Sequence, residues 1–568
     1  MSIWNSRITP RSAIQLAIAG VCATAIQEAA AKPDPLVTPP TKYVNAAKKV
    51  DPGCDPYKDY TCLDSYLGNG VWERMSNYYD LEYGRESAPV DPKAPPSRRD
   101  DFPPAAQTTS PMPFTEWPYG GTSPLGASMP GATDSPLMVG LANTDFGKWM
   151  AANNIQTYGW VDVGANLSTS KVHGGNAPAA YDYNPNAFDF NQAVLYVERV
   201  PDMVQKDHDD WGFRFSAIYG SDYRYTTSYG LGSYQLLHRN AANGWDLPML
   251  YLDWYTPSVG QGLNIRVGRY ISVPDIEAQL APNNYMYSHS MSYTLDNYTN
   301  EGIIASWQFN KNLTLQAGVS IGTEATFNHA WQTETNVNPN ALYPNATFKV
   351  DPGARPSGVA CVRYNADDGK TDVNICADGI NSGEWGYNNL QWKGMTFYHA
   401  FDEHWHLSAE VYQESQNHVP NLNNAYVENN LVATGTGTPF SPNIMPFNAP
   451  GMAYCSGNTA ARDAANLTCT SKSTGFVAYL NYSPDAMNNF SIRPEIYRDS
   501  QGQRTGTPTT YHNFALGWQH WLSPQIEIRP ELAYYHAGLP AFNGNGNDGI
   551  PADKRSETIL SGDIIYHF

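Results

Sequence analysis

The sequence predicts an all-β protein, a transmembrane antiparallel up-and-down β-barrel of about 14 strands (12–16) preceded by a Pro-rich N-terminal tail. Three observations predict this class. From residue 155 onward, apolar and polar residues alternate with the two-residue period of a strand. The connections between these segments are alternately short and long, which is typical of bacterial outer-membrane barrels. Charged residues make up only 16% of the 568-residue chain, whereas aromatic residues reach 13%.

The composition excludes two other classes of protein. Beyond residue 26, no uninterrupted apolar run approaches the roughly 20 residues of a membrane helix, so a helical membrane protein is excluded. Asp and Glu (54) outnumber Lys and Arg (35), and the net charge of −19 argues against a nucleic-acid partner. Low charge and many tyrosines fit a large β protein in which apolar and polar residues alternate.

Residues 1–31 predict a signal peptide that is cleaved on export. Arg7 and Arg11 precede an apolar stretch at 13–26, and three alanines at 29–31 provide a cleavage site. The alternative is a buried helix, but the basic, apolar and small-residue regions follow one another in the order of a signal. We therefore expect the mature chain in the bacterial outer membrane.

Residues 32–140 are rich in proline and predict a largely irregular periplasmic segment, because such a composition cannot continue a helix or a sheet. Residues 141–154 carry Phe146 and Trp149 at roughly helical spacing and predict a short helical lead-in or a plug at the barrel mouth. The barrel itself is expected to occupy residues 155–568.

The cysteines predict disulfides. Cys22 is expected to be lost with the signal peptide, which leaves six cysteines in three local pairs. An even number in an exported chain indicates disulfides, although six cysteines allow 15 connectivities and local pairing is a hypothesis. Zinc is the alternative, but no pair has C-x-x-C spacing or a histidine at ligand spacing. The expected pairs are Cys54–Cys62, Cys361–Cys376 and Cys455–Cys469.

The lengths of the connections predict the topology. Connections after even-numbered segments are short, whereas those after odd-numbered segments are mostly long, such as 273–301, 324–384 and 417–473. This pattern indicates short periplasmic turns and long outer loops, and it places the two later cysteine pairs in the two longest outer loops. The fourteen segments are 155–168, 190–200, 211–223, 249–256, 263–272, 302–309, 313–323, 385–400, 405–416, 474–483, 489–499, 509–522, 525–536 and 558–568.

The C-terminus carries an expected assembly signal. The chain ends in SGDIIYHF, in which Ile564, Tyr566 and Phe568 share one face of the last segment. This ending resembles the C-terminal recognition signal of bacterial outer-membrane proteins, except that Asp563 takes the position of the usual glycine. The resemblance implies that the barrel-assembly machinery binds Tyr566 and Phe568.

Six stretches carry a family resemblance: GWVDVGANLS (159–168), FNQAVLYVERVPD (190–202), GFRFSAIYGSDYR (212–224), LPMLYLDWYTP (247–257), GLNIRVGRYIS (262–272) and APNNYMYSHSM (281–291). In this order they resemble the OmpL-like β-barrel porin family. The resemblance covers about residues 155–325, and the Pro-rich tail and cysteine loops look like additions to it. It implies an outer-membrane barrel that acts as a pore, without a known substrate or catalytic residues.

The polar row of each segment is expected to face the lumen, and the apolar row to face lipid. Opposed charges across a water-filled constriction would select solutes by charge and polarity, and tyrosine rings would suit sugars that stack on their faces. The alternative is that these charges pair with one another and fill the barrel. The predicted pore-lining residues are Asp162, Glu198, Arg214, Asp253, Arg266, Glu410, Arg493, Glu495, Arg529, Glu531, Tyr158, Tyr196, Tyr251, Tyr412 and Tyr497.

The sequence therefore predicts an outer-membrane porin, a channel for passive diffusion of ions and small polar solutes. It is expected to be narrow, because about 14 strands lie below the 16 of open porins. The alternatives are a structural or adhesive surface barrel with disulfide-bearing loops and, less favoured, a barrel enzyme. No catalytic residue, metal or cofactor is expected, and the acidic run 207–210 around His208 is interpreted as a solvated turn. The expected partners are outer-membrane lipid, small polar solutes and the assembly machinery, with a homo-oligomer as an option.

Overall fold

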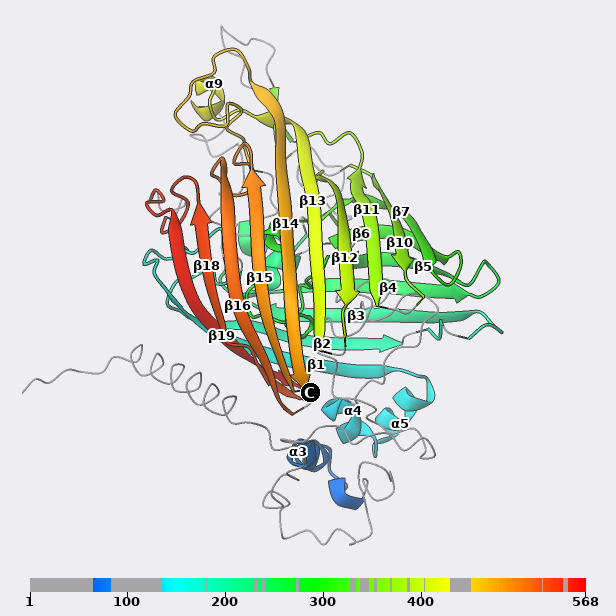
Figure 1. Ribbon diagram of the computed structural model, residues 1–568. Coiled ribbons are helices and arrows are strands. Elements are labelled where there is room, and N and C mark those ends of the chain that lie inside the picture. The colour runs from blue at the N-terminus through cyan, green and yellow to red at the C-terminus, as the bar shows by residue number, and fades with distance from the viewer. Residues whose placement is uncertain are drawn as a thin grey trace, which may run out of the picture.

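Most of the chain forms one closed antiparallel barrel (Figure 1). The predicted signal peptide at 1–31 and the pair Cys54–Cys62 lie outside the described residues. The computed structural model describes residues 65–82 and 135–568, apart from gaps at 180, 200, 204, 229, 231, 238–240, 272–274, 298, 327–333, 338–346, 352–354, 368–369, 386–388, 403, 430–450, 486, 524 and 545–549.

Each strand of the barrel pairs with its neighbours along the chain, and the sheet closes where β1 pairs with β19. The strands are β1 (Gln156–Ser168), β2 (Phe188–Arg199), β3 (Asp210–Gly220), β4 (Gly244–Thr256), β5 (Leu263–Ile271), β6 (Thr299–Gln308), β7 (Leu313–Thr323), β10 (Ser357–Asn365), β11 (Thr371–Ile380), β12 (Gln391–Ala400), β13 (Trp405–Pro420), β14 (Thr468–Asp485), β15 (Asn488–Asp499), β16 (Thr509–Ser523), β17 (Ile526–Ile528), β18 (Glu531–Ala537) and β19 (Ser556–His567).

The strands β17 and β18 are two halves of one strand. Both pair with β16 on one side and with β19 on the other. Pro530 lies between them, and it has no backbone N–H to donate to the ladder. The wall therefore has 16 strands, which corrects the prediction of about 14.

The two missed strands lie in the segment 324–384, which was predicted as one outer loop. This segment contains β10 and β11 in the wall, and a separate two-stranded sheet of β8 (Glu334–Val337) and β9 (Thr347–Asp351). The sequence signal of β10 is weak, because apolar residues lie on both rows: Ala360, Val362 and Tyr364 face outward, whereas Val359 and Cys361 face inward. Because two strands were missed together, every later strand keeps its odd or even position in the order. The alternation of short and long connections therefore holds.

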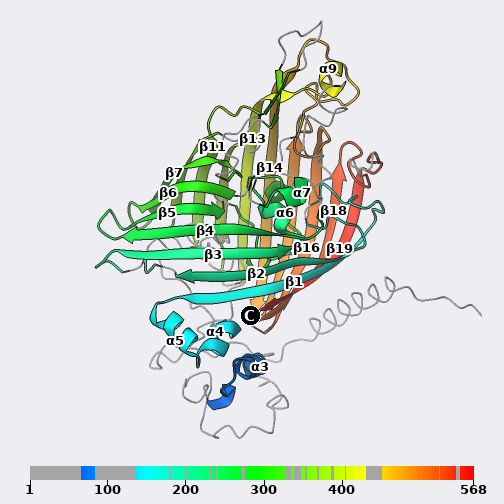
Figure 2. The same cartoon turned by 180° about the vertical axis from the view of Figure 1, so that it is seen from behind.

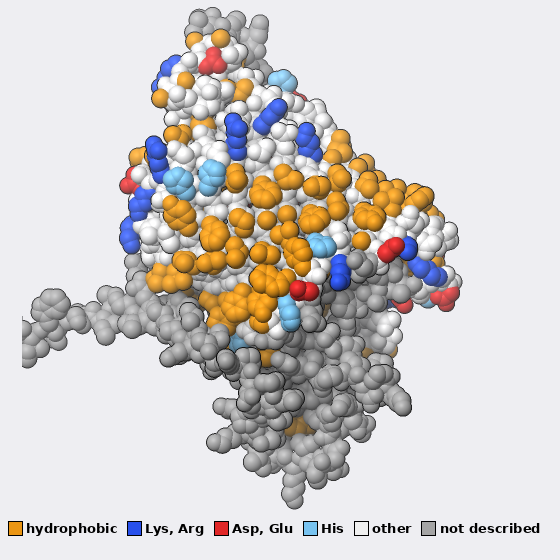
Figure 3. All heavy atoms as spheres, viewed as in Figure 1, with side chains coloured by type: hydrophobic (Ala, Val, Ile, Leu, Met, Phe, Trp, Pro, Cys, Tyr) orange, Lys and Arg blue, Asp and Glu red, His pale blue; other side chains and the backbone are white. Residues whose placement is uncertain are grey.

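Exposed large apolar side chains lie on wall strands from β2 to β19. Figure 3 shows the apolar belt that they form on one face of the barrel. Large apolar side chains on the outward rows are widely exposed, for example Leu252 on β4 and Val319 on β7, each with 61% of its surface exposed. The inward row of β7 is polar and buried, with Thr314 and Gln316. A continuous apolar surface of this kind is unfavourable in water, and it is the surface that a barrel presents to lipid.

Helices of the N-terminal part lie below the barrel, at the end where the C-terminus lies (Figures 1 and 2). They are α3 (Val71–Glu82), α4 (Pro136–Leu141) and α5 (Asp145–Ala152), and the last falls within the predicted helical segment 141–154. Ser135 Oγ donates to Thr157 O at 2.7 Å, which joins the start of α4 to β1. Tyr79 of α3 stacks on Tyr566 with ring centroids 4.6 Å apart.

Short helices lie in the connections: α6 (Tyr223–Thr226), α7 (Tyr234–Leu237), the 3₁₀ helix η2 (Ala281–Asn283), α8 (Met291–Thr294) and α9 (Ala425–Val427). Among the residues that the structure describes, no helix has the length and apolarity needed to cross a membrane.

Candidate pore and the segment that enters it

The connection between β5 and β6 folds into the barrel. We call residues 275–297 the inward segment. All of these residues are buried except Pro282 and Asn283, which are half-buried. The length of this connection predicted an outer loop, and the structure corrects that expectation.

The composition of the inward segment fits its buried position. The segment has no glycine, a residue that exposed loops commonly use, and Ile276, Leu280 and Met286 are fully buried in it. Serines supply short hydroxyl groups that bond locally: Ser290 Oγ accepts from Tyr293 N at 3.0 Å and caps α8. These features of the sequence indicate a buried segment, but a search for alternating apolar and polar residues does not detect them.

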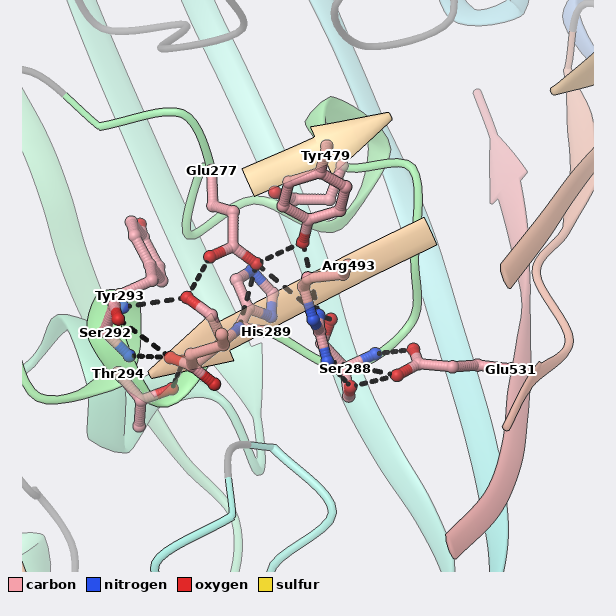
Figure 4. A network of polar contacts seen from close by, with 12 residues as sticks. Glu277, Ser288, His289, Ser292, Tyr293, Thr294, Tyr479, Arg493 and Glu531 are labelled. Carbon is pink, nitrogen blue, oxygen red and sulfur yellow. Dashed lines mark hydrogen bonds and ion pairs between the residues drawn. The ribbon is translucent and has the colours of Figure 1, made fainter. Parts of the chain in front are cut away.

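A polar network fixes the middle of the inward segment to β14, β15 and β18 (Figure 4). Arg493 donates to the backbone oxygen of Ser288 at 2.6 Å and to its hydroxyl at 2.8 Å. Glu531 accepts from Ser288 N at 2.8 Å and from Arg493 Nη2 at 3.2 Å. Glu277 accepts from Tyr479 OH at 2.5 Å and lies 3.6 Å from Arg493. One arginine thus joins a carboxylate of the wall to a carboxylate of the inward segment.

Contacts from β15 and from one further strand, β13, hold the segment at other points. Glu495 on β15 accepts from Ser292 N at 2.5 Å and from Ser292 Oγ at 2.8 Å. Tyr412 on β13 donates to the backbone oxygen of Ser292. Glu410, also on β13, accepts from Ile276 N at 3.1 Å. Buried hydrogen bonds to charged groups contribute about 1.5–3 kcal/mol each, so these contacts fix one position of the segment.

The segment also contacts the other side of the barrel. Gln192 on β2 donates to Gln279 O at 3.0 Å and accepts from Ala281 N at 3.1 Å. Arg529, at the β17–β18 junction, donates to Asn284 O at 3.0 Å. Because β2 and β13 are nearly opposite in the order of the strands, the inward segment crosses the lumen.

All fifteen residues predicted to line the pore lie on inward rows, with Tyr158 half-buried and the others buried. Three of the four predicted arginines pair with a carboxylate of a neighbouring strand. Arg493 differs, because it contacts Glu531 of β18, with β16 between the two strands, and Glu277 of the inward segment. This is the arrangement of the alternative interpretation, in which lumen charges pair with one another. The pairs between neighbouring strands are Arg214–Glu198 at 2.5 Å, Arg266–Asp253 at 2.9 Å and Arg529–Asp563 at 3.1 Å.

Neighbouring side chains cover ring faces of three of the inward tyrosines. Tyr158 and Tyr196 stack on each other with centroids 4.8 Å apart. The guanidinium of Arg266 lies 3.7 Å from the ring centroid of Tyr251. A sugar that stacks on aromatic rings needs a free face, so these three rings are poor sugar platforms.

Sequence reasoning missed Arg269, which also faces inward. Its guanidinium pairs with Asp246 through two contacts, at 2.9 and 3.0 Å. Strict alternation from Arg266 would point Arg269 outward. Gly268 between them has a φ of +132°, and this conformation changes the facing of the residues that follow.

Carboxylates outnumber arginines in the barrel interior. Among the buried residues described from 155 onward, twenty are Asp or Glu, eight are Arg and none is Lys. Asp162 is one of the carboxylates without an arginine partner, and its Oδ1 has no hydrogen-bond partner. The interior therefore carries an excess of acidic groups.

The two later cysteine pairs are disulfide-bonded, but only one lies near a loop. Cys455–Cys469 joins the connection between β13 and β14 to the first residues of β14. Cys361 and Cys376 face each other directly in the β10–β11 ladder, with both side chains buried. The expectation of an outer loop for Cys361–Cys376 is wrong, because both cysteines lie in wall strands that the sequence did not reveal.

The acidic run 207–210 lies in the connection between β2 and β3, with its last residue, Asp210, at the start of β3. His208 is exposed, and its ring nitrogen lies 3.3 Å from the exposed carboxylate of Asp207. This geometry fits the interpretation as a solvated turn.

A family model described as "Putative beta-barrel porin-2, OmpL-like" matches residues 154–568, the whole barrel. The sequence has no match among curated proteins. Among solved structures, an anion-selective porin from Comamonas acidovorans has a TM-score of 0.42 at 12% identity, covering 73% of this chain and 99% of that one. The outer membrane channel DcaP of Acinetobacter baumannii has a TM-score of 0.41 at 8% identity, covering 73% and 97%. With TM-scores this low, the assignment depends on the family model.

Proposed function

We propose that this protein, which belongs to the OmpL-like β-barrel porin family, forms a narrow, water-filled channel for passive diffusion of small polar solutes through the bacterial outer membrane. The observation that carries the proposal is the closed wall of 16 strands, apolar outside and charged inside. In a closed barrel every strand has a neighbour on both sides, so the backbone N–H and C=O groups find the hydrogen-bond partners that lipid does not offer. The charged side chains on the inward rows require water or partners of opposite charge.

The proposed narrowness depends on the inward segment. A wall of 16 strands is wide enough for an open aqueous channel, so strand number no longer supports a narrow pore. The inward segment crosses that space and is bonded to both sides of it through Gln192 and Glu410. Solutes would pass beside this segment, and its position would set the size limit.

The proposed solutes are small polar molecules, with a preference for cations. The excess of buried carboxylates over arginines supports this preference, because a lumen of one charge raises the local concentration of the opposite ion. The covered faces of Tyr158, Tyr196 and Tyr251 argue against a sugar-specific path.

Export through a cleaved signal peptide and recognition of Tyr566 and Phe568 by the assembly machinery belong to the same proposal. Phe568 N donates to Gly159 O at 2.8 Å, and Gly159 N donates to Phe568 O at 2.9 Å. The final residue therefore closes the barrel seam, which supports its importance in assembly.

Liposome swelling tests the proposed function. Liposomes that contain the folded protein are diluted into isotonic solutions of neutral solutes of increasing size. We expect swelling with small solutes such as glycine and a steep decline toward trisaccharides. Heat-denatured protein is the control, and the absence of swelling with the folded protein would favour a structural or adhesive barrel.

A further inference from the structure

Three buried carboxylates meet where the inward segment joins the wall. Asp275 lies at the start of the inward segment, Asp296 lies near its end, and Glu410 lies on β13. One oxygen from each of them lies within 4.8 Å of the other two. The cluster therefore brings together both ends of the inward segment and one strand of the wall.

The ion pairs of the buried arginines engage carboxylates outside this cluster. Arg493 contacts Glu277 and Glu531, and Arg504, which donates to Leu295 O beside Asp296, contacts Glu414. Burial, followed by the charges of Glu410 and Asp296, raises the pKa of Asp275. Three such groups without a cation would repel one another strongly at this depth.

Unused oxygen atoms also point to a ligand. Asp275 Oδ1, Asp296 Oδ2 and Glu410 Oε1 are buried, and no donor from outside the cluster reaches them. Thr396 offers a neutral oxygen on the inward row next to Glu410: it is fully buried, its hydroxyl is unpartnered, and it opposes Glu410 directly in the β12–β13 ladder. Side chains that oppose each other on one face of a sheet have Cβ atoms about 5 Å apart.

We propose that Asp275, Asp296 and Glu410 bind one calcium ion, with Thr396 placed to complete the oxygen set. Calcium binds oxygen ligands at about 2.3–2.6 Å, so two oxygens on one ion lie up to about 5 Å apart, as they do here. Magnesium requires shorter distances and keeps several waters, so it fits this spacing less well. The ion would join both ends of the inward segment to β13 and hold the segment in the lumen.

The test is equilibrium dialysis of the purified, detergent-solubilised protein with radioactive calcium after treatment with a chelator. Wild type should bind one ion per chain, and the double variant Asp275→Asn/Asp296→Asn should lose it. The matched control is Glu495→Gln, which removes a different carboxylate that holds the same segment and should keep the ion. Equal binding by wild type and the double variant would overturn the site.

A second measurement needs no variant. Calcium should raise the thermal unfolding temperature of the chelator-treated wild type, whereas magnesium at equal concentration should raise it much less. No binding and no shift would mean that the three carboxylates share protons instead. Neither measurement depends on conduction. A negative result would therefore reject the calcium site without rejecting the proposed channel, and a lack of conductance would not reject the calcium site.

Discussion

The guanidinium of Arg493 donates to the backbone oxygen of Ser288 at 2.6 Å, which links the wall strand β15 to the segment that crosses the lumen. The same guanidinium contacts Glu531 of the wall and Glu277 of the inward segment. Arg493 therefore controls both the position of the segment and the charge around it.

Replacing Arg493 with Ala should increase the single-channel conductance. The change removes the donors to Ser288 and leaves Glu277 and Glu531 unpaired, and breaking a buried pair costs about 3–5 kcal/mol. The inward segment should then leave its position for part of the time. Conductance in planar bilayers measures this effect.

The matched control for Arg493→Ala is Val319→Ala, which changes an outward residue of the apolar belt and should leave the conductance unchanged. Equal conductance of wild type and Arg493→Ala would show that the inward segment does not limit the flow.

Trypsin treatment of intact cells should cut the chain after Arg462 and leave Arg363 intact. Arg462 is exposed in the connection between β13 and β14, with 68% of its side chain accessible, whereas the side chain of Arg363 is buried in the wall, 1% accessible. Electrophoresis with and without reductant provides the measurement. The Cys455–Cys469 disulfide spans the cut, so the two fragments should separate only after reduction.

The control for the trypsin experiment is Arg462→Gln, which should resist cutting at this position. Fragments that separate without reductant would argue against the disulfide. Cutting at Arg462 only in broken cells would reverse the assumed orientation of the barrel.

The strands with strong alternation could be predicted from the sequence, and β10, β11 and the inward segment could not. The wall strand β7 has five apolar residues on one row and mostly polar residues on the other, so its sequence alone indicates a strand. By contrast, the burial of Ser288 and Ser292 depends on partners more than a hundred residues away, Arg493 and Glu495. Local patterns carry no information about such partners.

The sequence predicts the candidate site only in part, because local patterns do not reveal contacts between distant segments. The facing of Arg214 and Arg266 follows from alternation, and the structure has both on inward rows. The facing of Arg269 depends on the backbone at Gly268, and the choice of ion-pair partner depends on register between strands. Neither the facing of Arg269 nor the ion-pair partner of an arginine can be predicted from the sequence of one strand alone.

Deleting Phe568 should reduce the yield of folded barrel in the outer membrane several-fold, while synthesis and export continue. The deletion removes the two backbone hydrogen bonds to Gly159 at the seam, together with the terminal ring. Heat-modifiable migration of outer-membrane fractions measures the folded yield. The Phe568→Ala variant keeps the two backbone hydrogen bonds to Gly159. Comparing it with the deletion therefore distinguishes the effect of these hydrogen bonds from the effect of the aromatic ring. An unchanged yield of the truncated protein would contradict both roles.

The Asp222→Asn variant should be more heat-stable than wild type, and the difference should be larger at pH 8 than at pH 5. Burial raises the pKa of Asp222 to about 7, although Gln192 and Ser221 donate to its carboxylate. The unfolded chain has a pKa of about 3.9 at this group, so the folded state binds more protons between these values. Stability from the neutral form is present at low pH and is lost as the pH rises through 7.

Thermal unfolding followed by circular dichroism at the two pH values measures this effect. Asn keeps an acceptor for Gln192 and Ser221 but never ionises. A stability difference that is independent of pH would mean that Asp222 does not titrate in this range.

Single-channel recording of the purified wild type in a planar bilayer under a salt gradient tests whether the barrel conducts. We expect discrete conductance steps and a reversal potential that indicates preference for cations, because carboxylates outnumber arginines in the interior. A reversal potential that indicates preference for anions would contradict the assigned selectivity. No conductance at all from protein that is folded and heat-modifiable would contradict the channel itself.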